Sequence, residues 1–154
     1  MQSQASVKPL NTVELGAWRG LLRVHADLVR ELDAELEREH GLPLSSYEVL
    51  LHLHDAPGRR LRMNELADSV LLTVSGITRV VDRLVRDGLV ARERCQTDRR
   101  GLNAVLTDAG AEAFLAARCT HLRGIRERFH SRLDRTEQER LSAIWDTLLP
   151  GASA

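Results

Sequence analysis

The chain has 154 residues, 43% hydrophobic and 29% charged, which is enough for one domain with a sizeable core. Its formal net charge is zero, which excludes a uniformly basic nucleic-acid binder, and no apolar run approaches the roughly 20 residues that span a bilayer. The N-terminus lacks the pattern of a signal peptide, so we expect a cytoplasmic protein.

The first part of the chain predicts a tail followed by a long helix. Residues 1–10 are expected to form a disordered tail. Apolar residues at helical spacing then predict a helix from residue 11 to about residue 39, with Gly41 and Pro43 as its stop. Thr12 opens no capping box, so the sequence does not mark where this helix begins.

Three further helices are expected before the middle of the chain. One begins at a cap formed by Ser45 or Ser46 and stops at Pro57-Gly58. The other two span residues 63–69 and 74–86 and are separated by a short turn. Two short helices joined in this way are typical of a helix-turn-helix.

The second half predicts a hairpin and two more helices. Strand-like segments at 89–94 and 102–106 flank a polar stretch, which indicates a hairpin with a long basic tip. Thr107 is the expected cap of the helix that follows. Thr136 and Glu139 form a candidate capping box for the last helix.

This order predicts a mainly α fold with a small β-hairpin wing, that is, a winged helix-turn-helix flanked by terminal helices. We expect one domain over 11–149, with 44–106 as the DNA-binding lobe. The terminal segments 11–40 and 108–149 carry more apolar surface than so small a lobe needs, so we expect them to be dimerisation helices of a homodimer.

The helix over 74–86 has the pattern of a major-groove reader. At 100° per residue its aliphatic side chains share one face, while Ser75, Thr78, Arg79 and Arg83 lie on or beside the other. Arg bonds guanine edges bidentately, and Ser or Thr can bond bases or phosphates. The surrounding segment 57–101 holds ten Arg against six acidic residues, which fits an approach to a polyanion.

Three segments of the sequence carry recognisable motifs: MNELAD at 63–68, VSGITRVVDRLVRDGLV at 74–90 and TDRRGLNAVLTDAG at 97–110. Together they resemble the MarR family (multiple antibiotic resistance regulators). The third is similar to the family's wing signature, D-x-R followed by L-T-x-x-G. The flanking helices match in order and length, so the likeness covers roughly residues 12–149.

The resemblance implies a two-fold dimer in which each protomer places one recognition helix in the major groove of double-stranded DNA, at a palindromic operator. In the wing, Asp98 would pair with Arg100 and direct it into the minor groove, while Arg99 would contact phosphate or the minor groove. Thr73 would cap the recognition helix. One departure is at 101–102, where many relatives have a small residue followed by Lys.

The resemblance also implies a ligand-responsive regulator, and we expect a repressor that a small aromatic acid or phenol releases from DNA. Trp18, Arg19, His25 and Tyr47 lie in helices that would line a ligand cleft. Arg19 or His25 could pair with a carboxylate and the aromatic rings could stack on the ligand. The alternative is that Trp18 and His25 belong to the core and Arg19 to the surface.

Two alternative modes of regulation stay open, whereas the sequence argues against an enzyme or a metal site. A redox-responsive regulator acting through Cys95, beside Arg94 at the wing base, and an activator of the same fold are alternatives, and Cys119 is expected to be packed against its neighbours. The chain has no GxGxxG, P-loop, HExxH or GxSxG, so we expect no enzyme and no cofactor. Acidic residues such as Glu35, near Arg38, are expected on helix surfaces. No metal site is expected.

Overall fold

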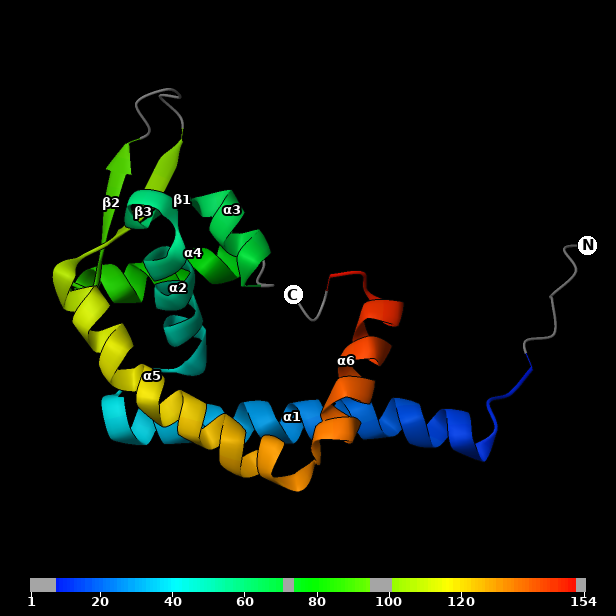
Figure 1. Ribbon diagram of the computed structural model, residues 1–154. Helices are drawn as coiled ribbons and strands as arrows, with labels where there is room; N and C mark the ends of the chain where they lie inside the picture. The colour runs from blue at the N-terminus through cyan, green and yellow to red at the C-terminus, as the bar shows by residue number, and fades with distance from the viewer. Residues whose placement is uncertain (1–7, 71–73, 95–100, 152–154) are drawn as a thin grey trace, which may run out of the picture.

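The computed structural model describes residues 8–70, 74–94 and 101–151, and Figure 1 shows its helices and strands. The elements in chain order are α1 (Thr12–His40), α2 (Leu44–Asp55), η1 (Pro57–Arg59), β1 (Arg60–Arg62), α3 (Met63–Ser69), α4 (Val74–Arg86), β2 (Val90–Arg94), β3 (Leu102–Leu106), α5 (Asp108–Arg128), η2 (His130–Arg132) and α6 (Arg135–Leu148). The mainly helical fold with a small hairpin confirms the predicted class. Most of the expected tail at 1–10 lies outside the described residues.

Helix α1 begins with a capping box at Asn11, one residue before Thr12, which the sequence analysis considered as a capping position. The Asn11 side-chain oxygen accepts from the backbone N–H groups of Val13 and Glu14, each at 2.9 Å, and the Glu14 carboxylate accepts from the Asn11 N–H at 2.7 Å. These bonds satisfy donors that the first turn leaves free. At the other end Gly41 adopts φ 60°, the left-handed conformation that ends the helix as expected.

Helix α2 does not start where we predicted. It begins at Leu44, and Ser46 is fully buried inside it rather than acting as a cap. The Leu44 N–H instead donates to the Asp33 carboxylate at 2.7 Å, so a side chain of α1 provides the cap. Such a cap depends on tertiary packing, which local sequence rules cannot show.

The starts of the last two long helices differ in how well they were predicted. Thr107 caps α5 as expected, because its hydroxyl accepts from the Gly110 N–H at 3.0 Å and donates to the Gly88 carbonyl at 2.8 Å. The predicted box at Thr136 is wrong. Helix α6 begins two residues earlier, at a capping box formed by Asp134 and Glu137.

Three antiparallel strands form the wing sheet in the order β1-β3-β2. The hairpin of β2 and β3 confirms the prediction, with Val90 opposite Leu106 and Arg94 opposite Leu102. Strand β1 was not predicted. It is only three residues long and pairs with β3 more than 40 positions later, Arg60 lying opposite Val105.

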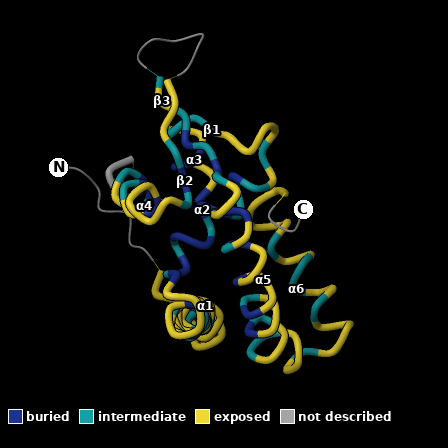
Figure 2. Tube along the Cα trace, turned by 90° about the vertical axis from the view of Figure 1, so that its left-hand side faces the viewer, coloured by how far each residue is buried: buried dark blue, intermediate teal, exposed yellow. Residues whose placement is uncertain are grey.

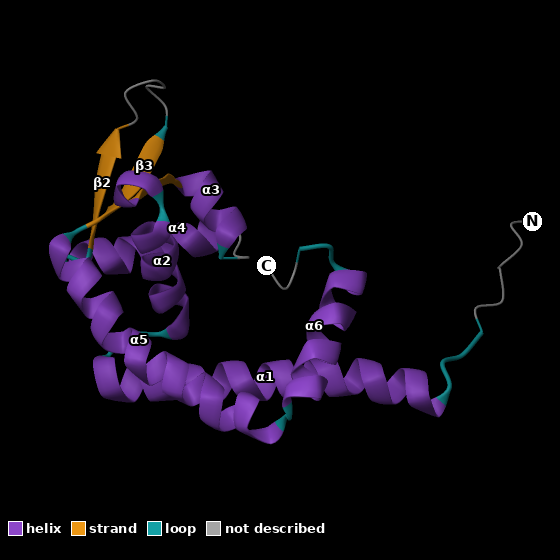
Figure 3. Cartoon of the chain, viewed as in Figure 1, coloured by secondary structure: helices purple, strands orange, loops and turns teal. Residues whose placement is uncertain are grey.

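The hydrophobic core lies where α2, α3, α4, α5 and the sheet meet. Figure 2 shows the buried residues gathered there, whereas α1, seen nearly end-on, is largely exposed. Side chains that are fully buried include Leu50, Leu66, Ile77 and Phe114. In Figure 3 the strands lie at one end of the molecule, and α1 and α6 extend away from them. Among the described helices, none is both long and apolar enough to cross a membrane.

Candidate nucleic-acid interface

Helix α4 has one buried and one open face. Ile77, Val81 and Leu84 are fully buried against the core, which fixes the helix on the lobe. Arg79 and Arg83 are exposed on the other side. Periodicity at 100° per residue predicted this division correctly. The exposed face can therefore present guanidinium groups to a polyanion without disturbing the packing.

Some of the predicted DNA contacts lie on described elements, and others lie outside the described residues. Arg79, Arg83 and half-buried Thr78 lie on α4, and Ser75 lies in its first turn, although its side chain is outside what is described. The remaining predicted contacts lie outside the described residues: Thr73, Asp98, Arg99 and Arg100. In the sequence the last three lie between the described strands β2 and β3.

Two ion pairs connect β2 to other elements of the fold, and residue spacing predicts neither of them. Asp82 of α4 lies 2.7 Å from Arg92 of β2. Arg60 of β1 lies 3.3 Å from Glu93, the neighbouring residue of β2. Both connections join residues ten or more positions apart on different elements, and side-chain spacing in the sequence does not reveal them. The first pair connects β2 to α4, and the second spans β3 to connect β2 with β1, because the strand order is β1-β3-β2.

Helix α5 approaches the recognition segment so closely that only a glycine fits. A Cβ placed on Gly110 would lie 2.0 Å from the Leu89 carbonyl oxygen and 2.7 Å from the Leu106 side chain. Thr107 binds the same turn, because its N–H donates to the Leu89 carbonyl at 3.1 Å. The end of α4 is thereby fixed to the start of α5, which connects the lobe to the rest of the chain (Figure 1).

Comparison with known proteins identifies the family. The sequence model of the MarR family matches residues 40–101. The structure of Sco3205, a MarR family transcriptional regulator from Streptomyces coelicolor in complex with DNA, is 34% identical, with a TM-score of 0.88, over 94% of this chain and 91% of that one. AbsC, a MarR family regulator from the same organism, is 31% identical, with a TM-score of 0.86, over 92% of this chain and 95% of that one.

The chain belongs to the MarR family of transcriptional regulators. This family is not enzymatic, in agreement with the absence of catalytic motifs. A curated relative is the HTH-type transcriptional repressor YetL of Bacillus subtilis, 33% identical over 92 residues. The match covers 58% of this chain and 55% of that relative, so it spans about half the length of each.

The four candidate ligand residues of this MarR-family chain do not form one cluster. Trp18 is 55% exposed and lines a cavity of about 300 Å³ between α1 and α6. His25 lines a neighbouring apolar cavity of about 420 Å³, which Trp145 also borders. Arg19 is exposed on α1. Tyr47 is buried in the core of the lobe, with its ring 4.5 Å from that of His121 and 5.5 Å from that of Phe114.

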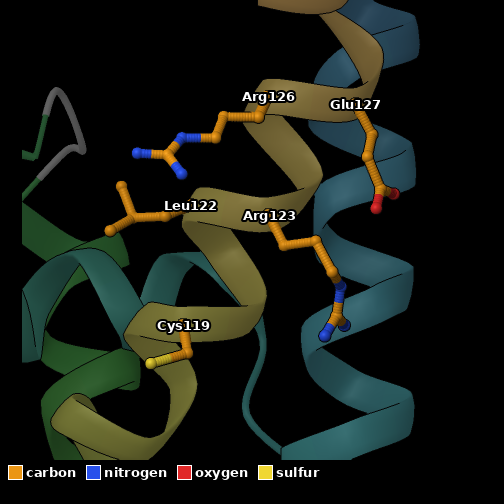
Figure 4. A pocket seen from close by; sticks show the side chains of 5 residues that line it. All are labelled: Cys119, Leu122, Arg123, Arg126 and Glu127. Carbon is orange, nitrogen blue, oxygen red and sulfur yellow. The ribbon is translucent and has the colours of Figure 1, made fainter.

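Of the two cysteines, Cys119 lies within the described residues and Cys95 does not. Cys119 is a free, exposed thiol on α5, so the expectation that it is packed against its neighbours is wrong. It lines a pocket of about 490 Å³ with four other α5 residues, and Figure 4 shows Cys119, Leu122 and Arg126 pointing to one side of the helix. Arg123 points to the other side, toward α1.

A charged junction joins α1 to α5, and residue spacing did not predict it. The expectation that Glu35 lies on the helix surface near Arg38 is wrong, because Glu35 is only 6% exposed. Its carboxylate lies 3.1 Å from Arg123 and 2.6 Å from Arg128. Burial would raise the pKa of Glu35, but the hydrogen bonds and positive charges of the two Arg outweigh it and hold the pKa below its usual value.

The junction extends by one turn of each helix. Glu39 accepts from Arg123 at 2.9 Å and from the Thr120 hydroxyl at 3.0 Å, and these bonds lower its pKa. The Thr120 oxygen also lies 2.8 Å from His40 Nε2. Gly124 leaves room for this packing, since a Cβ there would lie 2.8 Å from the Glu35 carboxylate. The junction fixes how the arm α1 is attached to the lobe.

Proposed function

We propose that the protein is a cytoplasmic transcriptional regulator that binds double-stranded DNA through α4 and the wing. The observation that carries the proposal is the two-faced helix α4, in which Ile77, Val81 and Leu84 are fully buried while Arg79 and Arg83 are exposed. A helix of 13 residues is about 20 Å long, which suits insertion into the major groove. A relative of 34% identity was solved in complex with DNA, which supports this proposal.

The proposed contacts divide into reading and positioning groups. Arg79, with Ser75 and Thr78, would contact base edges in the major groove. Arg83 and Thr73 would contact phosphates, which position the helix without reading the sequence. In the wing, Arg99 and Arg100 would approach the minor groove, with Asp98 orienting Arg100 through an ion pair.

The arms of the proposed homodimer are residues 11–40 and 108–149, and the lobe is 44–106. Apolar side chains of α1 and α6 that are exposed in a single chain support this assignment: Trp18 at 55%, Leu22 at 49%, Ile144 at 49% and Leu148 at 68%. Soluble monomers rarely leave a contiguous apolar surface of this kind open. A second copy of the chain would cover it, and a two-fold axis would match a palindromic operator.

In this proposal the dimer represses transcription and a small aromatic acid or phenol releases it. Repression is supported by the relative YetL, which is named as a transcriptional repressor. The cavities beside Trp18 and His25 offer aromatic and imidazole groups next to apolar walls, which suits a ring that bears an anionic group. A ligand there would change how α1 and α6 pack, and hence the spacing of the two recognition helices.

The experiment is selection of binding sites from a pool of randomised DNA duplexes. We expect enrichment of two inverted half-sites with centres about one helical turn apart. Arg79→Ala should change the enriched half-site, whereas Arg118→Ala, an exposed Arg of α5, should leave it unchanged. Recovery of no common sequence, or of a motif without inverted symmetry, would contradict the proposed dimeric reader.

A further inference from the structure

Asp82 is the one acidic residue of α4, and it lies among the arginines of the exposed face. In the helical projection it is within about 60° of both Arg79 and Arg86. A carboxylate at this place repels phosphates, so it weakens attraction to any DNA. Its partner is Arg92 of β2, at 2.7 Å. The two charges belong to the two elements that are proposed to meet DNA.

The pair is too open to contribute much to folding. The side chain of Asp82 is 49% exposed and that of Arg92 is 31% exposed. Ion pairs at this degree of exposure stabilise proteins by about 0–1 kcal/mol, because water screens the charges. The fold is held instead by the buried side of α4 and by the pairing of β2 with β3. Removal of the pair should therefore leave the fold intact, so its effect on DNA binding can be measured separately.

The pair acts on Arg92 itself. Without the Asp82 carboxylate, the guanidinium of Arg92 could bind any phosphate without reading sequence. With that carboxylate at 2.7 Å, a phosphate has to compete with Asp82 for Arg92, which lowers attraction to DNA in general.

We propose that Asp82 is a specificity-determining residue that acts by positioning Arg92. It raises the ratio of specific to non-specific DNA affinity, mainly by lowering non-specific affinity. The inference rests on the proposed DNA-binding function, because it concerns the same surface.

The test compares Asp82→Asn, Arg92→Gln and the double variant with the unaltered full-length chain. Each protein is titrated against the duplex enriched by selection and against a scrambled duplex, at several salt concentrations. Asp82→Asn should raise affinity for the scrambled duplex about three- to tenfold. It should also steepen the salt slope by about one unit per protomer, because each freed Arg92 neutralises one more phosphate. The specific-to-scrambled ratio should fall at least about fivefold.

The double variant and a charge-matched control separate positioning from general electrostatics. In the double variant the extra salt slope should disappear, because the freed guanidinium is gone, while the specificity ratio stays low. Glu93→Gln makes the same change of charge one residue along β2, but it releases Arg60 of β1 rather than a partner of α4. This control should keep the ratio within about twofold of the original chain.

Each other outcome has a distinct meaning. An unchanged ratio in Asp82→Asn overturns the inference, as does an equal loss of both affinities, which would indicate a purely structural role. An equal fall of the ratio in Glu93→Gln overturns it too, because net charge alone would then set specificity. If the unaltered chain itself does not distinguish the two duplexes, the proposed function fails and the inference fails with it.

Discussion

The carboxylate of Glu35 lies 2.6 Å from the guanidinium of Arg128, which joins the long arm helix α1 to α5. The Glu35 side chain is almost completely shielded from water, and Arg123 binds its other oxygen. A carboxylate in this position needs both partners, because an uncompensated buried charge is costly. The attachment of the arm to the lobe therefore depends on one acidic side chain.

Glu35→Gln should lower the free energy of unfolding by about 1–3 kcal/mol, since it removes the charge that satisfies two arginines. Thermal or urea unfolding measures the change. Glu31→Gln is the control, because the pair that Glu31 forms within the described part of the chain is with exposed Arg30, so the change in stability should be less than about 0.5 kcal/mol. The low pKa of Glu35 adds stability that is present above its usual pKa and is lost as the pH falls. Equal free energies of unfolding in the two variants would show that the junction does not stabilise the fold.

His121 makes stability depend on pH in a different range. Burial lowers its pKa, and its buried Nδ1 atom, in a ring beside Tyr47, has no hydrogen-bond partner among the residues that the structure describes. Above about pH 6.5 the ring is neutral both folded and unfolded. As the pH falls below that value, the unfolded chain takes up a proton that the folded ring resists, so stability should decline.

His121→Phe keeps a ring against Tyr47 and should reduce this decline between about pH 6.5 and 5. Unfolding by urea at a series of pH values measures it. His130→Phe replaces an exposed histidine and should retain the decline. A variant at His121 that loses stability with pH as steeply as the original chain would rule out His121 as the source.

The arm surface predicts a change of oligomeric state. Leu21 lines both cavities between α1 and α6, so Leu21→Glu places a charge on the apolar surface that a second copy is proposed to cover. We expect the molar mass in light scattering to fall from that of a dimer to that of a monomer. Leu102→Glu, an exposed position of β3 on the lobe, is the control and should remain dimeric. A dimer that tolerates Leu21→Glu would place the interface elsewhere.

The two neighbouring arginines Arg99 and Arg100 should respond differently to replacement by alanine. Arg100→Ala should weaken operator binding by about 1–3 kcal/mol if this side chain enters the groove. Arg99→Ala should mainly reduce the salt slope, because a phosphate contact releases counterions without reading bases. Fluorescence anisotropy at several salt concentrations measures both. A change of less than about 0.3 kcal/mol for Arg100→Ala would remove it from the site.

Local patterns predicted the parts of the molecule that local forces determine. Apolar spacing gave α4 and its two faces, and Thr107 was recognisable as the cap of α5. The start of α6 was missed because two overlapping boxes fit the same pattern, and Asp134 with Glu137, rather than Thr136 with Glu139, forms the one that caps.

What the sequence did not predict depends on distant partners. The Asp33 side chain caps α2 across a tertiary contact, and β1 exists only because β3 offers it a ladder. Within the site, the exposure of Arg79 follows from periodicity, whereas the pairing of Asp82 with Arg92 requires two elements to meet. Residue type and spacing alone do not reveal such a tertiary contact.

The central claim is that this chain binds DNA by sequence. The most direct measurement is an anisotropy titration of the purified protein against the DNA upstream of its own gene and against a scrambled duplex, at several salt concentrations. We expect saturable binding to the upstream DNA that survives excess competitor at physiological salt, at least about a thousandfold tighter than binding to the scrambled duplex. Equal, weak binding to both duplexes that vanishes as salt rises would contradict it.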